Sequence, residues 1–291
     1  MKMKFYKWLL TKGHPERSSK EHTGNIIRFE QWAKQENYTG IEQMNYNELL
    51  GYVQEQKKKN LKPQTINIRL NSITKYYDYL KEQGERENNP ARRLRIKKEG
   101  RRVLKDLLSS DQLDNLYEQY VQREKFREEK HKQLHQRNVV ILGMMIYQAV
   151  HSGELKKMEI KDIDLQSGTI YIPGTARSNS RKLKLEAHQI IPLNNYVNNV
   201  REKLLPKEDE LIKGNTHNII NWLLIELRTI NPQIRNAQQI RASVIMLWLK
   251  LHNIRKTQYM IGHKHISSTE KYREEDLEGL QKQLLKYHPF S

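Results

Sequence analysis

Residues 259–272 read Tyr-Met-Ile-Gly-His-Lys-His-Ile-Ser-Ser-Thr-Glu-Lys-Tyr, and the interpretation of the whole chain is organised around this stretch. An imidazole, His263, follows Gly262, and Tyr272 stands nine residues further on, after a polar turn. A tyrosine hydroxyl has an ordinary pKa of about 10, so it becomes a nucleophile near neutral pH only where neighbours remove its proton or stabilise developing charge. For an isolated Gly-His pair and an isolated tyrosine, the simpler interpretation is a helix cap and a half-buried aromatic ring.

Composition indicates the class of partner. The 52 lysines and arginines outnumber the 34 acidic residues, giving a net charge of +18 that is spread along the 291 residues. Such charge is typical of proteins that bind a polyanion, above all nucleic acid, although a ribosomal or membrane-surface protein could carry it too. The absence of cysteine excludes disulfides and thiolate metal sites. The same absence fits a reducing cytoplasm, and with nucleic acid as the expected partner we expect a cytoplasmic, nucleoid-associated protein. Because no apolar run approaches the roughly 18 residues that span a bilayer, we expect no membrane partner.

The first part of the chain, residues 1–90, has the patterning of a helical domain. Apolar residues recur at helical spacing over 18–37, from about 45 to 59, and from Pro63 to a stop at Gly84. These segments predict a compact bundle of about four helices. Its exposed lysines and arginines either contact phosphates or form an ordinary solvated face.

Residues 91–108 are densely basic with little periodicity, which predicts a linker between domains. The second domain, residues 109–291, opens with a capping box at Ser109 and Gln112 and contains a nearly apolar stretch over 138–150 that predicts a buried helix. Alternating or β-branched runs predict a small antiparallel sheet of short strands, at 169–172, around 182–186 and at 190–193. Helical patterns return over 195–257 and again over 276–287. The fold class is therefore mainly α (α+β): a helical domain followed by a mostly helical domain with a small antiparallel sheet.

With these elements placed, the second domain resembles the catalytic domain of the tyrosine recombinase, or phage integrase, family, and the first resembles the core-binding domain of that family. Three stretches carry the resemblance: Gly262-His263 with Tyr272 at the family's spacing, Gln-Gln-Ile-Arg-Ala-Ser over 238–243 in place of the His-x-x-Arg box, and residues 147–164 with Glu-Leu at 154–155. Each is weak alone, but the three in this order indicate the family.

The resemblance implies a DNA strand transferase that cuts and rejoins double-stranded DNA through a 3′-phosphotyrosine intermediate, in recombination or integration of a mobile element. It implies no metal or nucleotide cofactor, a monomer in solution, and a homotetramer on two short inverted DNA sites. It assigns Tyr272 as the nucleophile, Arg241 as the family's second arginine, and His263 as a hydrogen-bond donor to the scissile phosphate. The last helix would dock into a neighbouring protomer, although a simpler role as a lid on its own core explains it equally well.

The same resemblance expects a basic residue in the sheet to protonate the departing 5′-oxygen. Lys184 is the first candidate by spacing, with Lys182 or Arg177 as alternatives. An ordinary solvated strand face explains each of them equally well.

Two positions depart from the family's pattern. His151 stands where its first arginine is expected, and Gln238 stands where the histidine of the His-x-x-Arg box is expected. Loss of one preorganised donor typically costs about 10²- to 10³-fold in rate. A protonated His151 would still offer positive charge, and the amide of Gln238 still donates a hydrogen bond.

Three other functions compete with an active recombinase. One is a catalytically degenerate DNA-binding protein of the same fold, which the two substitutions favour. A type IB topoisomerase shares the tyrosine chemistry, but the helical first domain and the compact length favour a recombinase. An unrelated basic helical protein, such as a transcription regulator or an RNA binder, would require the spacing of His263 and Tyr272 to be accidental.

Overall fold

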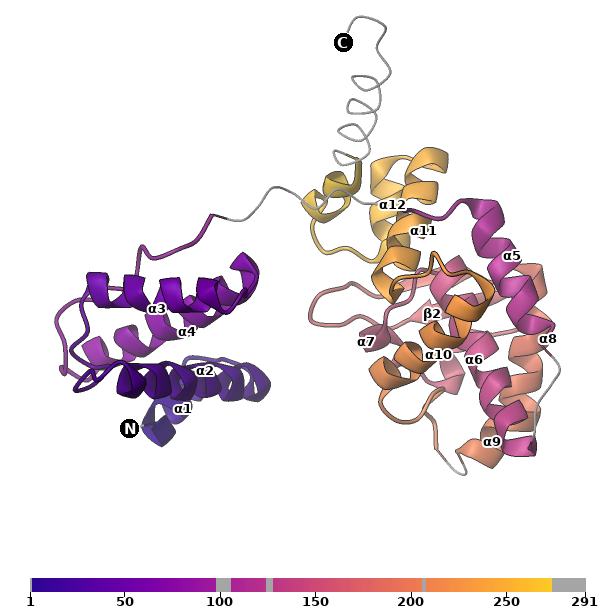
Figure 1. The fold of residues 1–291 in the computed structure, drawn as a ribbon. Helices are drawn as coiled ribbons and strands as arrows, with labels where there is room; N and C mark the ends of the chain where they lie inside the picture. The colour runs from indigo at the N-terminus through magenta and orange to yellow at the C-terminus, as the bar shows by residue number, and fades with distance from the viewer. Residues whose placement is uncertain (1, 98–105, 124–127, 206–207, 274–291) are drawn as a thin grey trace, which may run out of the picture. The chain divides into compact units, whose positions relative to one another are not determined.

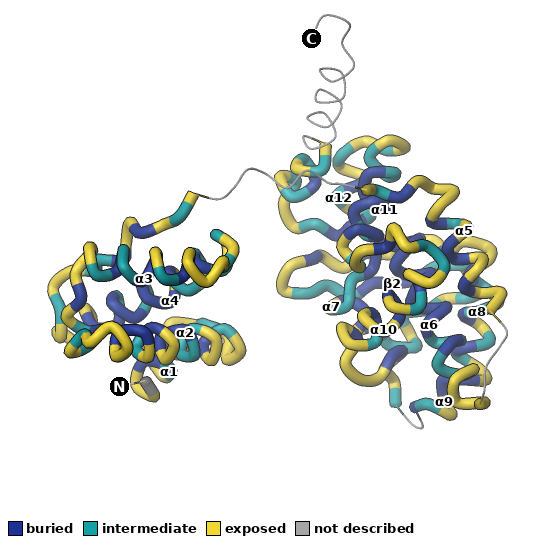
Figure 2. The backbone as a smooth tube through the Cα atoms, viewed as in Figure 1, coloured by how far each residue is buried: buried dark blue, intermediate teal, exposed yellow. Residues whose placement is uncertain are grey.

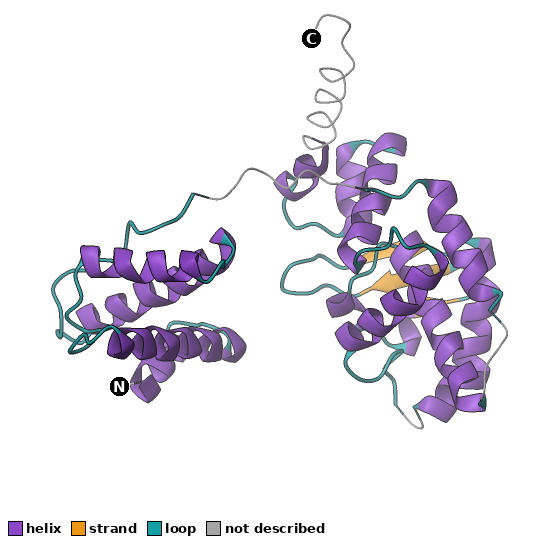
Figure 3. Cartoon of the chain, viewed as in Figure 1, coloured by secondary structure: helices purple, strands orange, loops and turns teal. Residues whose placement is uncertain are grey.

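The computed structural model describes residues 2–97, 106–123, 128–205 and 208–273. The chain divides into two compact units, Met1–Arg101 and Arg102–Ser291. The described residues are mostly helical, and the second unit contains a small antiparallel sheet (Figures 1 and 3), so the predicted fold class is confirmed. No helix in these ranges is long and apolar enough to cross a membrane. The helix predicted over 276–287 lies outside the described residues.

The first unit is built from helices α1 (Lys2–Thr11), α2 (Glu16–Gln35), α3 (Tyr46–Lys58) and α4 (Pro63–Glu82). The helices turn buried faces toward one another (Figure 2). The core that these faces form is rich in aromatic rings, among them Phe5, Phe29 and Tyr76. Proline at the first position starts α4, and Gly84, with a left-handed φ of +72°, follows its end. The predicted helical segments of the first domain are therefore present.

The segment predicted as a linker, 91–108, is packed at both of its described ends. Ala91 and Leu94 are buried in the core of the first unit, and the side-chain amide of Asn67 exchanges two hydrogen bonds of 2.9 Å with the backbone of Ile96. In the second unit Leu108 is buried, and its N–H donates to Ser243 Oγ at 2.9 Å. Residues 98–105 lie outside the described residues.

The second unit surrounds a long buried helix, α6 (Glu129–Tyr147), whose last two turns are almost entirely enclosed. The predicted capping box is present, because Ser109 and Gln112 exchange the two expected bonds at the start of α5 (Ser110–Val121). The remaining helical elements are α7 (Ser152–Leu155), η1 (Ile160–Asp162), α8 (Ala187–Asn195), η2 (Tyr196–Val200), α9 (Arg201–Leu204), α10 (Thr216–Ile230), α11 (Ala237–Leu251) and α12 (Ile254–Ile261).

The sheet has the strand order β1 (Ile163–Asp164), β2 (Thr169–Ile172) and β3 (Arg181–Lys184), with both pairs antiparallel. The strand predicted at 190–193 is wrong, because these residues, Pro192 among them, lie inside α8. Leu193 is buried whereas Ile191 is 79% exposed. An apolar run of four residues is too short to distinguish a helical face from a strand.

Candidate active site

A cavity of about 440 Å³ in the second unit brings together four of the predicted site residues: His151, Gln238, Arg241 and Tyr272. They come from three separate segments: the turn before α7, the first turns of α11, and a helical stretch over 267–273. The other polar lining residues are Ser152, His217, Asn221 and Asn236, and the apolar ones are Met145, Val150, Ile220, Leu224 and Ala237. The cavity thus presents converging polar groups against an apolar wall.

Helix α11 orients Gln238 and Arg241 toward the same cavity. Residues three apart share one face of a helix, and Asn236 fixes the start of α11 because its side chain accepts from the N–H of Gln239. Gln239 is turned inward and buried, and its amide donates to the carbonyls of Asp106 and Gln233 at 2.6 and 3.0 Å. Of the two neighbouring glutamines, Gln239 is therefore the structural one and Gln238 the one that faces the cavity.

The guanidinium of Arg241 is held by backbone carbonyls. It donates to the carbonyl of Ala149 and, at 3.0 Å, to that of Ile261, while Nη1 lies 3.5 Å from a carboxylate oxygen of Glu154. Only 15% of the side chain is exposed, and burial lowers the pKa of Arg241. A cation that is desolvated and fixed in this way suits the stabilisation of developing negative charge.

His151 caps a helix with its ring. Its Nδ1 accepts from the N–H groups of Gly153 and Glu154 at 3.0 and 3.3 Å, and Glu154 accepts in return from the N–H of His151. An Nδ1 that accepts two hydrogen bonds carries no proton, so the ring is neutral with its proton on Nε2. Burial lowers the pKa of His151, consistent with that state. The positive charge considered for His151 from the sequence is therefore not favoured by the structure.

The ring of His263 stacks on that of Tyr272, with centroids 6.1 Å apart and planes 22° from parallel. Nδ1 of His263 lies 2.9 Å from the hydroxyl oxygen of Thr269, which is fully buried. Burial, with the nearby charges of Arg241 and Arg181, lowers the pKa of His263 to about 4. At neutral pH the ring is neutral, and with Thr269 donating to Nδ1 its Nε2 is a donor.

Behind the cavity, Arg181 and Glu154 form an ion pair whose side chains are both fully buried. Two nitrogens of Arg181 donate to the two carboxylate oxygens at 2.6 and 3.2 Å, and Nη2 also lies 3.4 Å from the carbonyl oxygen of Gln148. Burial alone would raise the pKa of Glu154, but the hydrogen bonds and charge of Arg181, with the charge of Arg241, hold it below its ordinary value. Glu154 is therefore an anion between two arginines.

Gly262 ends α12 in the left-handed conformation, with φ +77°, which confirms the predicted helix cap. Its carbonyl accepts from the N–H of Asn179 at 2.8 Å, and Ser178 forms an isolated β-bridge with His263. The loop between β2 and β3 is thus tied to the turn that carries His263.

The three basic residues considered as proton donors lie differently. Lys182 and Lys184 are exposed, and they alternate along β3 with Arg181, so their side chains leave the opposite face of the strand. Neither lines the cavity. Arg177 is exposed in the loop tied to His263, where Thr175 Oγ1 accepts from its N–H at 3.1 Å. Its charge is among those that lower the pKa of His151.

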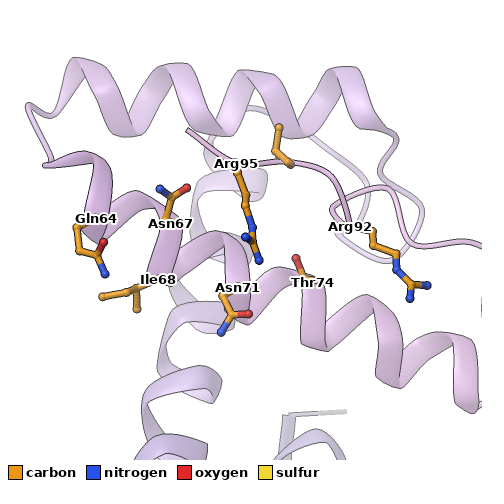
Figure 4. A pocket seen from close by; sticks show the side chains of 8 residues that line it. Gln64, Asn67, Ile68, Asn71, Thr74, Arg92 and Arg95 are labelled. Atoms are coloured by element: carbon orange, nitrogen blue, oxygen red, sulfur yellow. The ribbon is translucent and has the colours of Figure 1, made fainter. Parts of the chain in front are cut away.

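The first unit carries a polar groove of about 310 Å³ between α4 and residues 92–95 (Figure 4). Gln64, Ile68 and Asn71 follow one exposed face of α4, and Arg92 and Arg95 lie across from them. Amide side chains beside arginines are the groups that contact base edges and phosphates.

Comparison with known proteins agrees with the resemblance found in the sequence. The family model for the phage integrase N-terminal SAM-like domain matches residues 4–84. Tyrosine recombinase XerC of Oceanobacillus iheyensis is 21% identical over 283 residues, covering 93% of this chain and 89% of the relative, and XerD of the same organism is 23% identical over 297 residues, covering 96% and 95%. Over nearly its whole length the chain is similar to tyrosine recombinases.

Solved structures of recombinases share the fold. XerH bound to a palindromic difH substrate, in a post-cleavage complex, has a TM-score of 0.74 at 17% identity, covering 94% of this chain and 80% of that one. The Tn1549 transposon integrase in complex with transposon right end DNA has a TM-score of 0.66 at 16% identity, covering 92% and 93%. At such identities the likeness concerns the fold of a tyrosine recombinase and not the individual residues of its site.

Sequence reasoning missed two residues of the site, Arg181 and His217, and the capping role of a third, His151. Arg181 precedes two exposed lysines of the same strand, Lys182 and Lys184, and its partner Glu154 is distant in sequence. His217, in the first turn of α10, lines the cavity, and its only signal was the Asn-Thr helix start at 215–216. The capping role of His151 had a local signal, since glutamate stands three residues later as in a capping box.

Proposed function

We propose that this tyrosine recombinase is an active site-specific recombinase that cuts and rejoins double-stranded DNA through Tyr272. The observation that carries the proposal is the convergence of Tyr272, Arg241, Gln238 and His151 on one cavity, with His263 stacked on the tyrosine ring. The names of the relatives, and the DNA in the complexes of the structural neighbours, support the same substrate class. We propose a homotetramer on two DNA sites as the assembly that acts.

In the proposed reaction the hydroxyl oxygen of Tyr272 attacks a backbone phosphorus, and the bond from that phosphorus to the 5′-oxygen breaks. The products are a 3′-phosphotyrosine and a 5′-hydroxyl, so one proton leaves the tyrosine and one reaches the departing oxygen. Because the phosphotyrosine is itself a phosphodiester, a 5′-hydroxyl from another strand can reverse the step without ATP. Rejoining to a new partner strand completes the exchange.

The proposed phosphate clamp contains one guanidinium and several neutral donors. Arg241 supplies fixed positive charge to a non-bridging oxygen. His263 and Gln238 supply N–H donors, and His151 supplies Nε2–H because its Nδ1 is occupied by the cap.

We assign the second cation to Arg177, not to Lys184 or Lys182. The support is the link of its loop to His263 and the effect of its charge on the pKa of His151. A guanidinium stays protonated, so Arg177 would stabilise charge on the departing oxygen and not transfer a proton to it.

We further propose that the polar groove of the first unit contacts DNA. Gln64 and Asn71 present amides that can pair with adenine, and Ile68 offers an apolar contact for a thymine methyl group. Arg92 and Arg95 would bind phosphates.

The alternative function is a DNA-binding protein of the same fold that does not cleave. The substitutions at His151 and Gln238 favour it, because the clamp then has fewer charges than the family's pattern.

Covalent trapping separates the two functions. Binding sites are selected from a pool of randomised duplexes, and nicked suicide duplexes carrying those sites are incubated with the full chain.

We expect a protein–DNA adduct that survives denaturation, forms with the wild type and is absent from Tyr272→Phe. The matched control is Tyr259→Phe, which changes an exposed tyrosine outside the cavity. If the wild type binds the selected site but gives no more adduct than Tyr272→Phe, the non-cleaving alternative is correct.

A further inference from the structure

Arg181 lies behind the site and contacts three residues next to it, Glu154, Gln148 and Gly262. Its side chain is fully buried, and no part of it lines the cavity. Its Nε is buried without a hydrogen-bond partner among the described residues. A guanidinium that is enclosed in this way and not fully satisfied costs folding free energy, so its position calls for an explanation beyond stability.

Each of its contacts leads in one step to a residue of the site. The carboxylate of Glu154, which it holds with two hydrogen bonds, faces Arg241 at 3.5 Å and accepts from the N–H of His151. The carbonyl of Gln148, 3.4 Å from its Nη2, precedes Ala149, whose own carbonyl accepts from Arg241.

The third contact is with the turn that carries His263. A Cβ added to Gly262 would lie 2.7 Å from Nη1 of Arg181 and 3.3 Å from its Cζ, so the glycine backbone rests on the guanidinium. Two residues before Arg181 in the same chain segment, Asn179 donates to the carbonyl of Gly262. Arg181 therefore packs between residues 148–154, which bind the side chain of Arg241, and the turn at Gly262, which precedes His263.

We propose that Arg181 is a positioning residue, which joins Arg241 and His151 to His263 through Glu154 and Gly262 and so fixes the spacing of the phosphate clamp. This inference rests on the proposed function of the same site. The planar fork of arginine is needed because it binds two carboxylate oxygens and a carbonyl at once, which an ammonium group cannot reproduce. Misplacement of catalytic groups by a distant mutation lowers the reaction rate.

The test compares Arg181→Lys with Arg201→Lys in the full chain. Arg201 is the matched control, because it is also a buried arginine of the second unit, donating to the carbonyl of Glu210 at 2.9 Å, but lies outside the cavity lining. The measurements are the affinity for the selected duplex and the single-turnover rate of adduct formation at saturating suicide duplex. We expect Arg181→Lys to cleave about 10²-fold more slowly, with affinity changed less than about 3-fold, because displacement of catalytic groups by about 1 Å has costs of this size.

A second readout needs no activity. The amide resonances of Gly262 and His263, followed by nuclear magnetic resonance without DNA, should shift in Arg181→Lys and stay in place in Arg201→Lys. If the wild type forms no adduct, the proposed function fails and these resonances alone decide the inference. Unmoved resonances, or cleavage by Arg181→Lys at the rate of Arg201→Lys, overturn it.

If Arg181→Lys does not fold, the double variant Arg181→Gln with Glu154→Gln replaces it, since that change removes both charges of the fully buried ion pair. It is compared with Glu154→Gln alone. Positioning predicts that the double variant is at least about 10-fold slower than the single one, because the contacts to Gln148 and Gly262 are lost as well. A double variant as fast as the single variant would show that Arg181 only neutralises Glu154, which refutes the inference.

Discussion

Gly262→Ala is the most direct perturbation of the site that replaces none of the catalytic side chains. Gly262 is buried and has a φ of +77°, a conformation that L side chains rarely adopt. The new methyl group would lie 2.7 Å from Arg181 Nη1 and 2.8 Å from the carbonyl oxygen of Asn179. Both separations are too short for a carbon atom, so the turn or the guanidinium must move.

The size of the effect follows from two contributions. The left-handed conformation costs roughly 1–2 kcal/mol for a residue with a Cβ. Overpacking of a well-packed site adds typically about 1–3 kcal/mol, so we expect the second unit to lose about 2–5 kcal/mol of unfolding free energy. Gly168→Ala is the matched control: φ there is +61°, and nothing lies within 4 Å of the added Cβ. It should lose only the backbone part, about 1–2 kcal/mol.

The assay must report on the second unit alone, because a chain of two units need not unfold in one step. Hydrogen exchange in increasing urea, read from peptides of residues 109–261, provides that report. The adduct rate is measured on the same samples, and we expect Gly262→Ala to be about 10²-fold slower than Gly168→Ala. Equal stability and equal rate in the two variants would refute the close approach of Gly262 to Arg181.

Four further outcomes follow from the contacts. His151→Ala removes a helix cap and a clamp donor, so the second unit should lose about 1 kcal/mol of unfolding free energy, measured by the same exchange assay, and adduct formation should fall about 10²-fold. The pKa of His263 is about 4 in the folded state and about 6.5 in the unfolded chain, so the unfolded state binds more protons between these pH values. The free energy of unfolding should therefore fall as pH falls from about 6.5 to about 4. In urea titrations at several pH values, His263→Gln should show a weaker dependence of the unfolding free energy on pH over this range. Gln64→Ala with Asn71→Ala should relax sequence preference by about 1–3 kcal/mol per amide–base pair, seen as a broader motif when sites are selected again. Lys184→Ala should form adduct at the wild-type rate, because its side chain leaves the strand face opposite Arg181; a large loss would restore it as the proton donor.

The elements that sequence predicted well are those with local determinants. The capping box at Ser109, the proline that starts α4 and the glycine that ends α12 act within one helical turn, so their signals stand next to one another in the chain. The same holds for the pairing of Gln238 with Arg241, since residues three apart on a helix share a face. Local rules do not by themselves bring His151, Gln238, Arg241 and Tyr272 to one cavity. The sequence predicts that they form one site only through the resemblance to the family, which has its motifs in this order.

What sequence could not predict depends on partners distant in the chain. In the sequence Arg181 stands beside the solvated lysines of the same strand and looks like one of them. Its burial depends on the carboxylate of Glu154, which is 27 residues away in the chain. Spacing alone could not tell which face of β3 Lys184 lies on, so the sequence left Lys184, Lys182 and Arg177 as alternatives. The apolar run at 190–193 was assigned to a strand from its local propensity. Its helical conformation in α8 depends instead on packing against α6, which the local sequence does not show.

The two departures from the family's pattern can be understood together. Replacement of an arginine by a neutral His151 removes charge from the clamp, and the remaining neutral donors gain their effect only from fixed geometry. The structure holds those donors firmly: His151 by two backbone N–H groups, His263 by Thr269, and Arg241 by two carbonyls and Glu154. We infer that this recombinase depends more on rigid placement than on total charge. Its cleavage rate should therefore be more sensitive to changes behind the site, at Gly262 and Arg181, than to changes in salt at saturating DNA.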